Sequence, residues 1–178
     1  MIRLLPLLLL ASCGEPKDDT SPPADTGDPP PQCDDGPHEA TECGFHEDLG
    51  EGFNYRRLQN EAEGVDVIVV REATGFGPGE TTQYTLRGFA LAKDGCLSCI
   101  DSPDALNYVT GHHNWFDDAE ATIEGVLHRC HMQYQPEDPD DSMSEWVWSY
   151  DLTGLDPATE DVLWGPIPLE LTYPDSPW

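Results

Sequence analysis

The sequence predicts an all-β protein, in which a single antiparallel β-sandwich domain follows a disordered Pro/Asp-rich tether. Three observations support this prediction. Residues 65–70 form a β-branched run bounded by glycine, and residues 145–152 place large side chains on alternate positions. No strand-helix-strand rhythm recurs along the 178 residues. Since parallel strands need crossover connections of that kind, antiparallel pairing is expected.

The first expected strand, residues 65–70, is followed by a Gly-rich stretch at 75–79. That stretch lacks the lysine and the helix of a phosphate loop, so we predict a turn. Residues 82–93 also alternate, but Tyr84 and Leu86 have one parity while Phe89 and Leu91 have the other. A one-residue shift at Gly88, as in a β-bulge, reconciles the two halves of this strand.

Residues 117–135 allow two interpretations. As a helix, the segment collects Ala119, Ile123, Val126, Leu127 and Cys130 on one face, with Gly125 in the middle. As a hairpin, it turns at residues 124–125 between two alternating arms. We favour the hairpin, because the arms are β-branched and aromatic and no C-terminal helix cap is present.

The clearest strand is residues 145–152. Its pattern puts Trp146, Trp148, Tyr150 and Leu152 on one face. Near the end of the chain, residues 166–173 alternate again, but Pro166 and Pro168 cannot donate to a ladder. Its first half is therefore expected to be an edge strand.

The chain begins with Arg3, a short leucine-rich run and small residues that precede a cysteine, which is the pattern of an export signal. The run is far shorter than the about 20 apolar residues of a membrane-spanning helix. The sequence Leu10-Ala11-Ser12-Cys13 resembles the lipobox of bacterial lipoproteins. The resemblance implies that Cys13 is diacylated, becomes the first residue after cleavage, and is then often N-acylated.

The resulting organisation has four parts: a signal peptide at 1–12, an acidic Pro-rich tether at 13–32, a possibly disulfide-stapled loop at 33–44, and the β-sandwich at 45–178. The tether has almost nothing apolar to bury, so it is expected to stay extended and to hold the domain up to about 50 Å from the bilayer. Gly14 follows the lipidated cysteine, in place of the Asp that retains many lipoproteins in the inner membrane. By that analogy, an outer-membrane or cell-surface location is expected.

The formal net charge is −27, with 35 acidic residues against eight lysines and arginines. A nucleic-acid partner is therefore not expected, because phosphate backbones are recruited by clustered basic side chains. Anionic lipid headgroups are disfavoured for the same reason, so membrane affinity is assigned to the acyl chains on Cys13.

Beyond Cys13, the chain has five cysteines, and export makes disulfides the default. The simplest pairing is the local one of Cys33 with Cys43, because nothing apolar nearby would otherwise order that segment. Cys130 pairing with either Cys96 or Cys99 is the second expectation, and one thiol then remains.

Metal binding is the alternative use of these residues. Cys96 and Cys99 have ligand spacing, and His112, His113, His128, Cys130 and His131 could supply further zinc or copper ligands. Strand geometry opposes this, because it sends His128 and His131 to opposite faces. Calcium at the acidic stretch 138–142 is a further alternative, but the pattern departs from that of a helix-loop-helix calcium site.

The function expected from the sequence is that of a lipid-anchored envelope or surface protein. Its β-domain is expected to be non-catalytic and to serve binding, adhesion or scaffolding, with an unknown protein or glycan as the ligand and no cofactor. An exported zinc- or copper-binding protein is the alternative. The first hypothesis rests on the leader and the tether, and the metal alternative rests on the His and Cys residues of 96–131.

Overall fold

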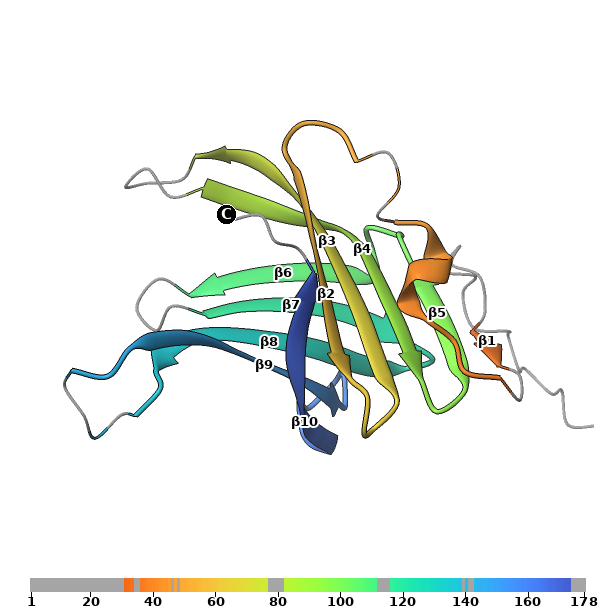
Figure 1. Ribbon diagram of the computed structural model, residues 1–178. Helices are drawn as coiled ribbons and strands as arrows, with labels where there is room; N and C mark the ends of the chain where they lie inside the picture. The colour runs from red at the N-terminus through yellow and green to blue at the C-terminus, as the bar shows by residue number, and fades with distance from the viewer. Residues whose placement is uncertain are drawn as a thin grey trace, which may run out of the picture.

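The computed structural model describes residues 31–33, 36–45, 47, 49–76, 82–111, 116–138, 140 and 143–173 (Figure 1). These residues form ten β-strands and a short 3₁₀ helix, so the predicted all-β class is confirmed. The elements are β1 (Gln32–Cys33), η1 (Ala40–Cys43), β2 (Phe53–Asn60), β3 (Val65–Phe76), β4 (Thr82–Lys93), β5 (Cys96–Ile100), β6 (Leu106–Gly111), β7 (Phe116–Ile123), β8 (Val126–Pro136), β9 (Trp146–Leu155) and β10 (Val162–Tyr173).

The strands make one continuous antiparallel sheet in the order β1-β5-β4-β3-β2-β10-β9-β8-β7-β6. Strand β10 joins its two halves, because residues 162–169 pair with β9 and residues 170–173 pair with β2. In Figure 1 the strands of one half run across those of the other. The two layers expected of a sandwich are thus the facing halves of a single bent sheet.

Several local predictions are confirmed. The β3–β4 register shifts between Val70 and Arg71, opposite Gly88 and Leu86, which is the expected bulge. Strands β7 and β8 form the expected hairpin, with positive φ at Glu124 and Gly125. Such a turn matches the twist of the strands, which is why the hairpin forms rather than the alternative helix. Pro166 and Pro168 lie in the part of β10 whose ladder partners are all on β9.

Other boundaries were wrong. Strand β3 continues to Phe76, so Gly75 belongs to the strand and not to a turn. Residues 96–100, for which no strand is predicted, form β5 because they pair with the end of β4. Gln32, the last residue of the predicted tether, lies in β1. Residues 1–30, with the predicted signal, Cys13 and most of the tether, lie outside the described residues.

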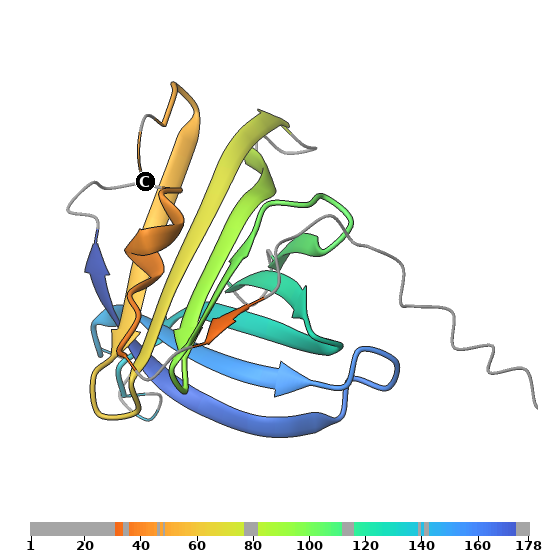
Figure 2. The ribbon, with the colours of Figure 1, turned by 90° about the vertical axis from the view of Figure 1, so that its right-hand side faces the viewer.

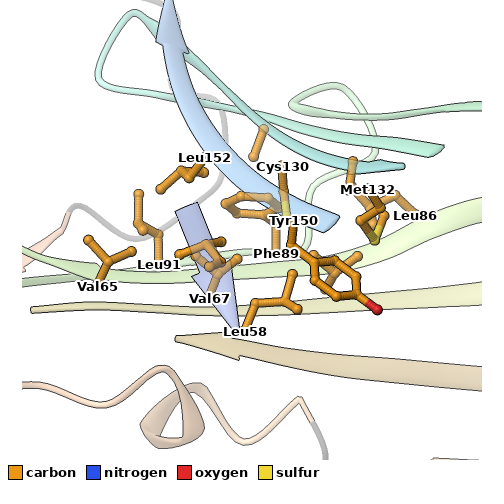
Figure 3. Close-up of a cluster of buried hydrophobic side chains, with 14 of the residues drawn as sticks. Leu58, Val65, Val67, Leu86, Phe89, Leu91, Cys130, Met132, Tyr150 and Leu152 are labelled. Carbon is orange, nitrogen blue, oxygen red and sulfur yellow. The ribbon is translucent and has the colours of Figure 1, made fainter. Parts of the chain in front are cut away.

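The main core lies between the two halves of the sheet and is built from alternate residues of each strand (Figure 3). Phe89, Leu58 and Leu152 are fully buried at its centre. In Figure 3, Val65 and Leu91 lie at one end of this cluster, and Met132, Leu86 and Tyr150 lie toward the other. That second end leads to the surface described below.

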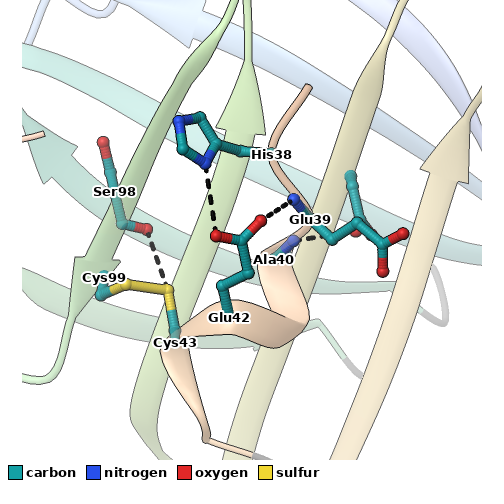
Figure 4. Close-up of a disulfide and its surroundings, with 8 residues drawn as sticks. His38, Glu39, Ala40, Glu42, Cys43, Ser98 and Cys99 are labelled. Atoms are coloured by element: carbon teal, nitrogen blue, oxygen red, sulfur yellow. Dashed lines mark hydrogen bonds and ion pairs between the residues drawn. A yellow bond between two sulfur atoms is a disulfide. The ribbon is translucent and has the colours of Figure 1, made fainter. Parts of the chain in front are cut away.

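A smaller apolar cluster covers the outer face of the first half of the sheet. Helix η1 packs there, on the side away from β6–β9, with Ala40 buried against Ile68, Val70 and Ala90 (Figure 2). The Ala40 amide donates to Asp66 Oδ2 at 2.9 Å. The Glu39 amide donates to Glu42 Oε1 at 2.7 Å and closes a capping box (Figure 4). These bonds dock the N-terminal segment to the sheet.

The disulfide predictions were wrong in their pairing. Cys33 bonds to Cys96, and Cys43 bonds to Cys99 (Figure 4). The segment 33–44 is therefore stapled to β5 and does not close on itself. Cys96 and Cys99 are three residues apart on a strand, so they point to opposite faces, and each meets the cysteine on its own side.

Cys130 remains a free thiol, and its predicted pairing with Cys96 or Cys99 was also wrong. Its side chain is fully buried in the main core, while the Cys99 disulfide lies beside the smaller cluster on the outer face. Burial raises the pKa of the Cys130 thiol, so it stays protonated at neutral pH.

No helix in the described part of the chain is both long and apolar enough to cross a membrane.

Candidate binding surface

Four aromatic side chains continue the core face of β8 and β9 from the edge of the core into solvent. Tyr134 on β8 lies directly opposite Trp148 on β9, and Met132 lies opposite Tyr150. Trp146, Trp148 and Tyr150 occupy alternate positions of β9 and so share one face. We call Tyr134, Trp146, Trp148 and Tyr150 the aromatic ledge.

The exposure of this face rises steadily along β9. Leu152 is 0% exposed, Tyr150 8%, Trp148 38% and Trp146 50%. The same row of side chains therefore begins as core and ends in solvent. Neighbouring exposed tryptophans of this kind are typical of an interaction site.

The four rings form a connected stack. Tyr134 lies 5.4 Å from Trp146 and 5.3 Å from Trp148, measured between ring centroids. Trp148 and Tyr150 are 6.5 Å apart with an interplanar angle of 16°. Each ring restricts its neighbours, so a ligand would meet a preformed surface.

Arg56 of β2 reaches this stack from the facing half of the sheet. Its guanidinium carbon lies 5.0 Å from the centroid of the Trp148 ring and 5.5 Å from that of Tyr150. Nη1 also donates to Met132 Sδ at 3.4 Å. Burial lowers the pKa of Arg56 from 12.5 to about 10, and the group stays cationic at neutral pH. Arg56 thus covers the inner rings of the ledge.

A second arginine lies next to this end of the core. Arg71 of β3 stacks on Tyr84 with 3.7 Å between the guanidinium carbon and the ring centroid. It donates to the Tyr108 hydroxyl, and Nη1 lies 3.4 Å from Asp117 Oδ2. Burial raises the pKa of Tyr108, so its hydroxyl stays protonated. We call Arg56, Arg71, Tyr84, Tyr108 and Asp117 the polar layer.

The outer end of the ledge is acidic. The β8–β9 connection carries the exposed residues Glu137, Asp138, Asp140 and Glu145, and Glu145 directly precedes Trp146. The Glu137 amide donates to the Glu145 carbonyl at 2.8 Å, which holds the two chains of the connection together. The connection that leads into Trp146 therefore carries a concentration of negative charge.

The lysines and arginines that lie outside the polar layer in the described part of the chain are engaged in ion pairs. Arg57 pairs with Asp66 at 2.7 Å, Arg87 with Glu72 at 2.7 Å, and Arg129 with Glu120 at 2.6 Å. Lys93 pairs with Asp94. The net charge of −27 already includes these cations, and none of the pairs lies beside Trp146 in the chain.

Among the described residues, the structure does not bring the predicted metal ligands together. His128 packs on Trp164 at 5.4 Å between centroids, and burial lowers its pKa. His131 points to the opposite face, where its bond with Asp118 raises its pKa. His112 and His113 lie outside the described residues. In the part of the chain that is described, no group of three or more His, Cys, Asp or Glu side chains could hold a metal ion.

The remaining predicted site is the acidic stretch 138–142. Asp138 and Asp140 are exposed at the tip of the β8–β9 connection, and residues 139, 141 and 142 lie outside the described residues. The Asp140 amide donates to Asp138 Oδ1 at 3.0 Å. This is the turn-forming use of an aspartate side chain.

A polar hollow of about 410 Å³ lies elsewhere, beside the turns at 61–64 and 94–95. Its central carboxylate, Asp66, is already bound by Arg57 and by the Ala40 amide. Because the Asp66 carboxylate is engaged within the protein, the hollow is a weaker candidate than the ledge.

The alternation of residues 145–152 places the ledge residues of β9 on one face but does not identify them as a site. Arg56 and Arg71 are not among the predicted site residues. The alternation of side chains along each strand could have shown that both arginines face inward. Arg71 continues the inward series of Val65, Val67 and Val69, and Arg56 shares the face of Leu58. Comparisons with models of protein families, with curated proteins and with solved structures found no match to this chain.

Proposed function

We propose that the protein is a lipid-anchored, non-catalytic binding protein of the cell envelope, whose aromatic ledge docks a partner protein. The observation that carries this proposal is the continuous exposure of Trp148 and Trp146 at 38% and 50%. The lipobox at Leu10-Ala11-Ser12-Cys13 supports the anchor, and the Pro-rich segment after it supports a role in display.

The composition of the site favours a protein partner. Tryptophan, tyrosine and arginine are the residue types that most often dominate the energetics of protein interfaces. The ledge combines exposed Trp146 and Trp148 with Tyr134, while Arg56 fixes the inner rings. A glycan is the competing ligand, because sugar rings also stack on aromatic faces. The metal alternative has less support, since His128 and His131 point to opposite faces.

The position of the ledge suits display away from a membrane. The described chain enters the sheet at β1, and β1 and the β8–β9 connection lie at opposite sides of the molecule in Figure 1. A tether that leads from Cys13 to β1 would leave the ledge pointing away from the anchored side.

The anchor is tested with the Cys13→Ser variant. Cells fed an alkyne-tagged palmitate should label the unaltered chain, and the variant should carry no label and leave the membrane fraction. A Cys13→Ser chain that is processed and located like the unaltered chain would show that the anchor is wrongly assigned.

The ledge is tested by photo-crosslinking in cells. A benzophenone amino acid replaces Trp146, or as a control Val162, which is 62% exposed and lies opposite Leu155 at the far end of β9. We expect a protease-sensitive adduct from position 146 and none from position 162. Equal adducts at both positions, no adduct at either, or an adduct removed by glycosidases would overturn the assignment of a protein partner.

A further inference from the structure

We infer that the ledge recognises a basic segment of its partner, and that an arginine side chain of that segment stacks on the outer rings Trp146 and Tyr134. The inference rests on the proposed function and specifies the chemistry of the partner. Three observations carry it: the internal cation stacking, the acidic surroundings of Trp146, and the exposure of that ring.

The protein already shows the binding geometry internally. Arg56 places its guanidinium over Trp148 and Tyr150 at 5.0 and 5.5 Å, and Arg71 lies over Tyr84 at 3.7 Å. The ring quadrupole attracts a cation at such distances. Because Arg56 occupies the inner rings, a second guanidinium is directed to the outer pair, Tyr134 and Trp146, whose rings are tilted by 41° with centroids 5.4 Å apart.

The charge around the outer pair favours a cation. Glu145 is adjacent to Trp146 in the chain, and Glu137 is tied to Glu145 across the connection. Asp138 and Asp140 are exposed at the same tip. A basic segment approaching the ledge therefore gains from steering by these carboxylates, and its association should weaken as salt increases.

Arginine fits the site better than lysine. Its planar guanidinium stacks flat on an aromatic ring and is more weakly hydrated than an ammonium group, so less hydration is lost on stacking. The guanidinium also carries several donors in one plane, which leaves some free to bond to oxygen acceptors while the plane faces a ring.

The inference is tested with labelled peptides and the full chain in non-ionic detergent. The probes are a fluorescein-labelled peptide of alternating glycine and arginine, the same peptide with lysine, and the same peptide with uncharged citrulline. Fluorescence anisotropy at low salt should show saturable binding in the order arginine, lysine, citrulline. Binding of the arginine peptide should fall as NaCl is raised to 0.5 M.

Variants locate the binding. Trp146→Ala should weaken binding of the arginine peptide about two- to fivefold, the range of an exposed cation–π contact. Trp146→Phe should recover part of that loss, and Glu145→Gln should weaken binding while leaving every ring in place. Leu163→Ala is the matched control, because Leu163 is 54% exposed on β10 and should leave binding unchanged.

The outcomes separate the two proposals. If position 146 crosslinks a protein but the citrulline peptide binds as well as the arginine peptide, the basic-segment inference is wrong and the proposed function stands. If the arginine peptide binds equally to the Trp146→Ala and Leu163→Ala variants, the inference is also wrong. Absence of any adduct at position 146 contradicts the proposed function itself.

Discussion

Replacing Arg56 tests the physical account of the ledge most directly. A pKa lowered from 12.5 to about 10 corresponds to roughly 3 kcal/mol of unfavourable free energy for holding the charge in the core. The contacts of the guanidinium with the Trp148 and Tyr150 rings stabilise the fold by about 1–2 kcal/mol for each ring, because the guanidinium is buried. The two contributions nearly cancel, so the charge itself should add little net stability.

Arg56→Met keeps the length and packing of the side chain and removes its charge. We therefore expect its free energy of unfolding to lie within about 1 kcal/mol of the unaltered chain, as for other buried charges replaced by apolar residues. Arg56→Ala instead leaves a cavity beside Met132 and should lose about 2–4 kcal/mol.

The assay is urea unfolding followed by tryptophan fluorescence, on full chains that also carry Cys13→Ser, with the disulfides intact. The midpoint and slope together give the free energy of unfolding. If Arg56→Met loses as much stability as Arg56→Ala, the charge stabilises the core, and its desolvation cost does not cancel its stacking on the two rings.

Three further predictions concern the rest of the fold. Peptide mapping without reductant should recover the two β5 disulfides, with Cys130 alkylated only after unfolding; alkylation of Cys130 in the folded chain would contradict its burial. His131 has a raised pKa, so its bond with Asp118 contributes stability below pH 6.5 that is lost as the pH rises through the folded-state pKa; His131→Gln should remove that slope, and an unchanged pH profile would refute the assignment. Gly154→Ala should cost about 1–3 kcal/mol, because the added methyl group meets the Trp164 ring, and Trp164→Leu should recover part of that loss; a fully stable Gly154→Ala chain would show that the ring moves freely.

The strands that could be predicted are those whose residues alternate on their own. The β7–β8 hairpin and the bulge at Gly88 could be predicted from the local sequence. The turn depends on the residues at its centre, and the bulge depends on the alternation of apolar side chains on either side of it. Strand β5 could not be predicted, because its five residues are extended only through pairing with β4. The disulfide pairing was predicted wrongly for the same reason. The closeness of Cys33 and Cys43 in the sequence does not indicate which face of β5 each cysteine reaches.

The candidate site was predictable only in part. The shared face of Trp146, Trp148 and Tyr150 follows from period-two alternation. That the face leaves the core at Trp148 depends on where the opposite half of the sheet ends, which is a long-range property. Arg56 and Arg71 looked like ordinary surface cations in sequence, and only the fold shows that both face inward.

The polar layer marks where the apolar core ends. Arg56 lies over the rings of Trp148 and Tyr150, and Arg71 lies 3.4 Å from Asp117, so charged side chains follow the last apolar residues of the core. Both arginines are already almost fully buried, so the structure carries their desolvation cost as it stands. Trp148 and Trp146 lie farther along the same face of β9, where the exposed fraction reaches 38% and 50%. The exposed part of the ledge therefore begins where the apolar core gives way to charged side chains.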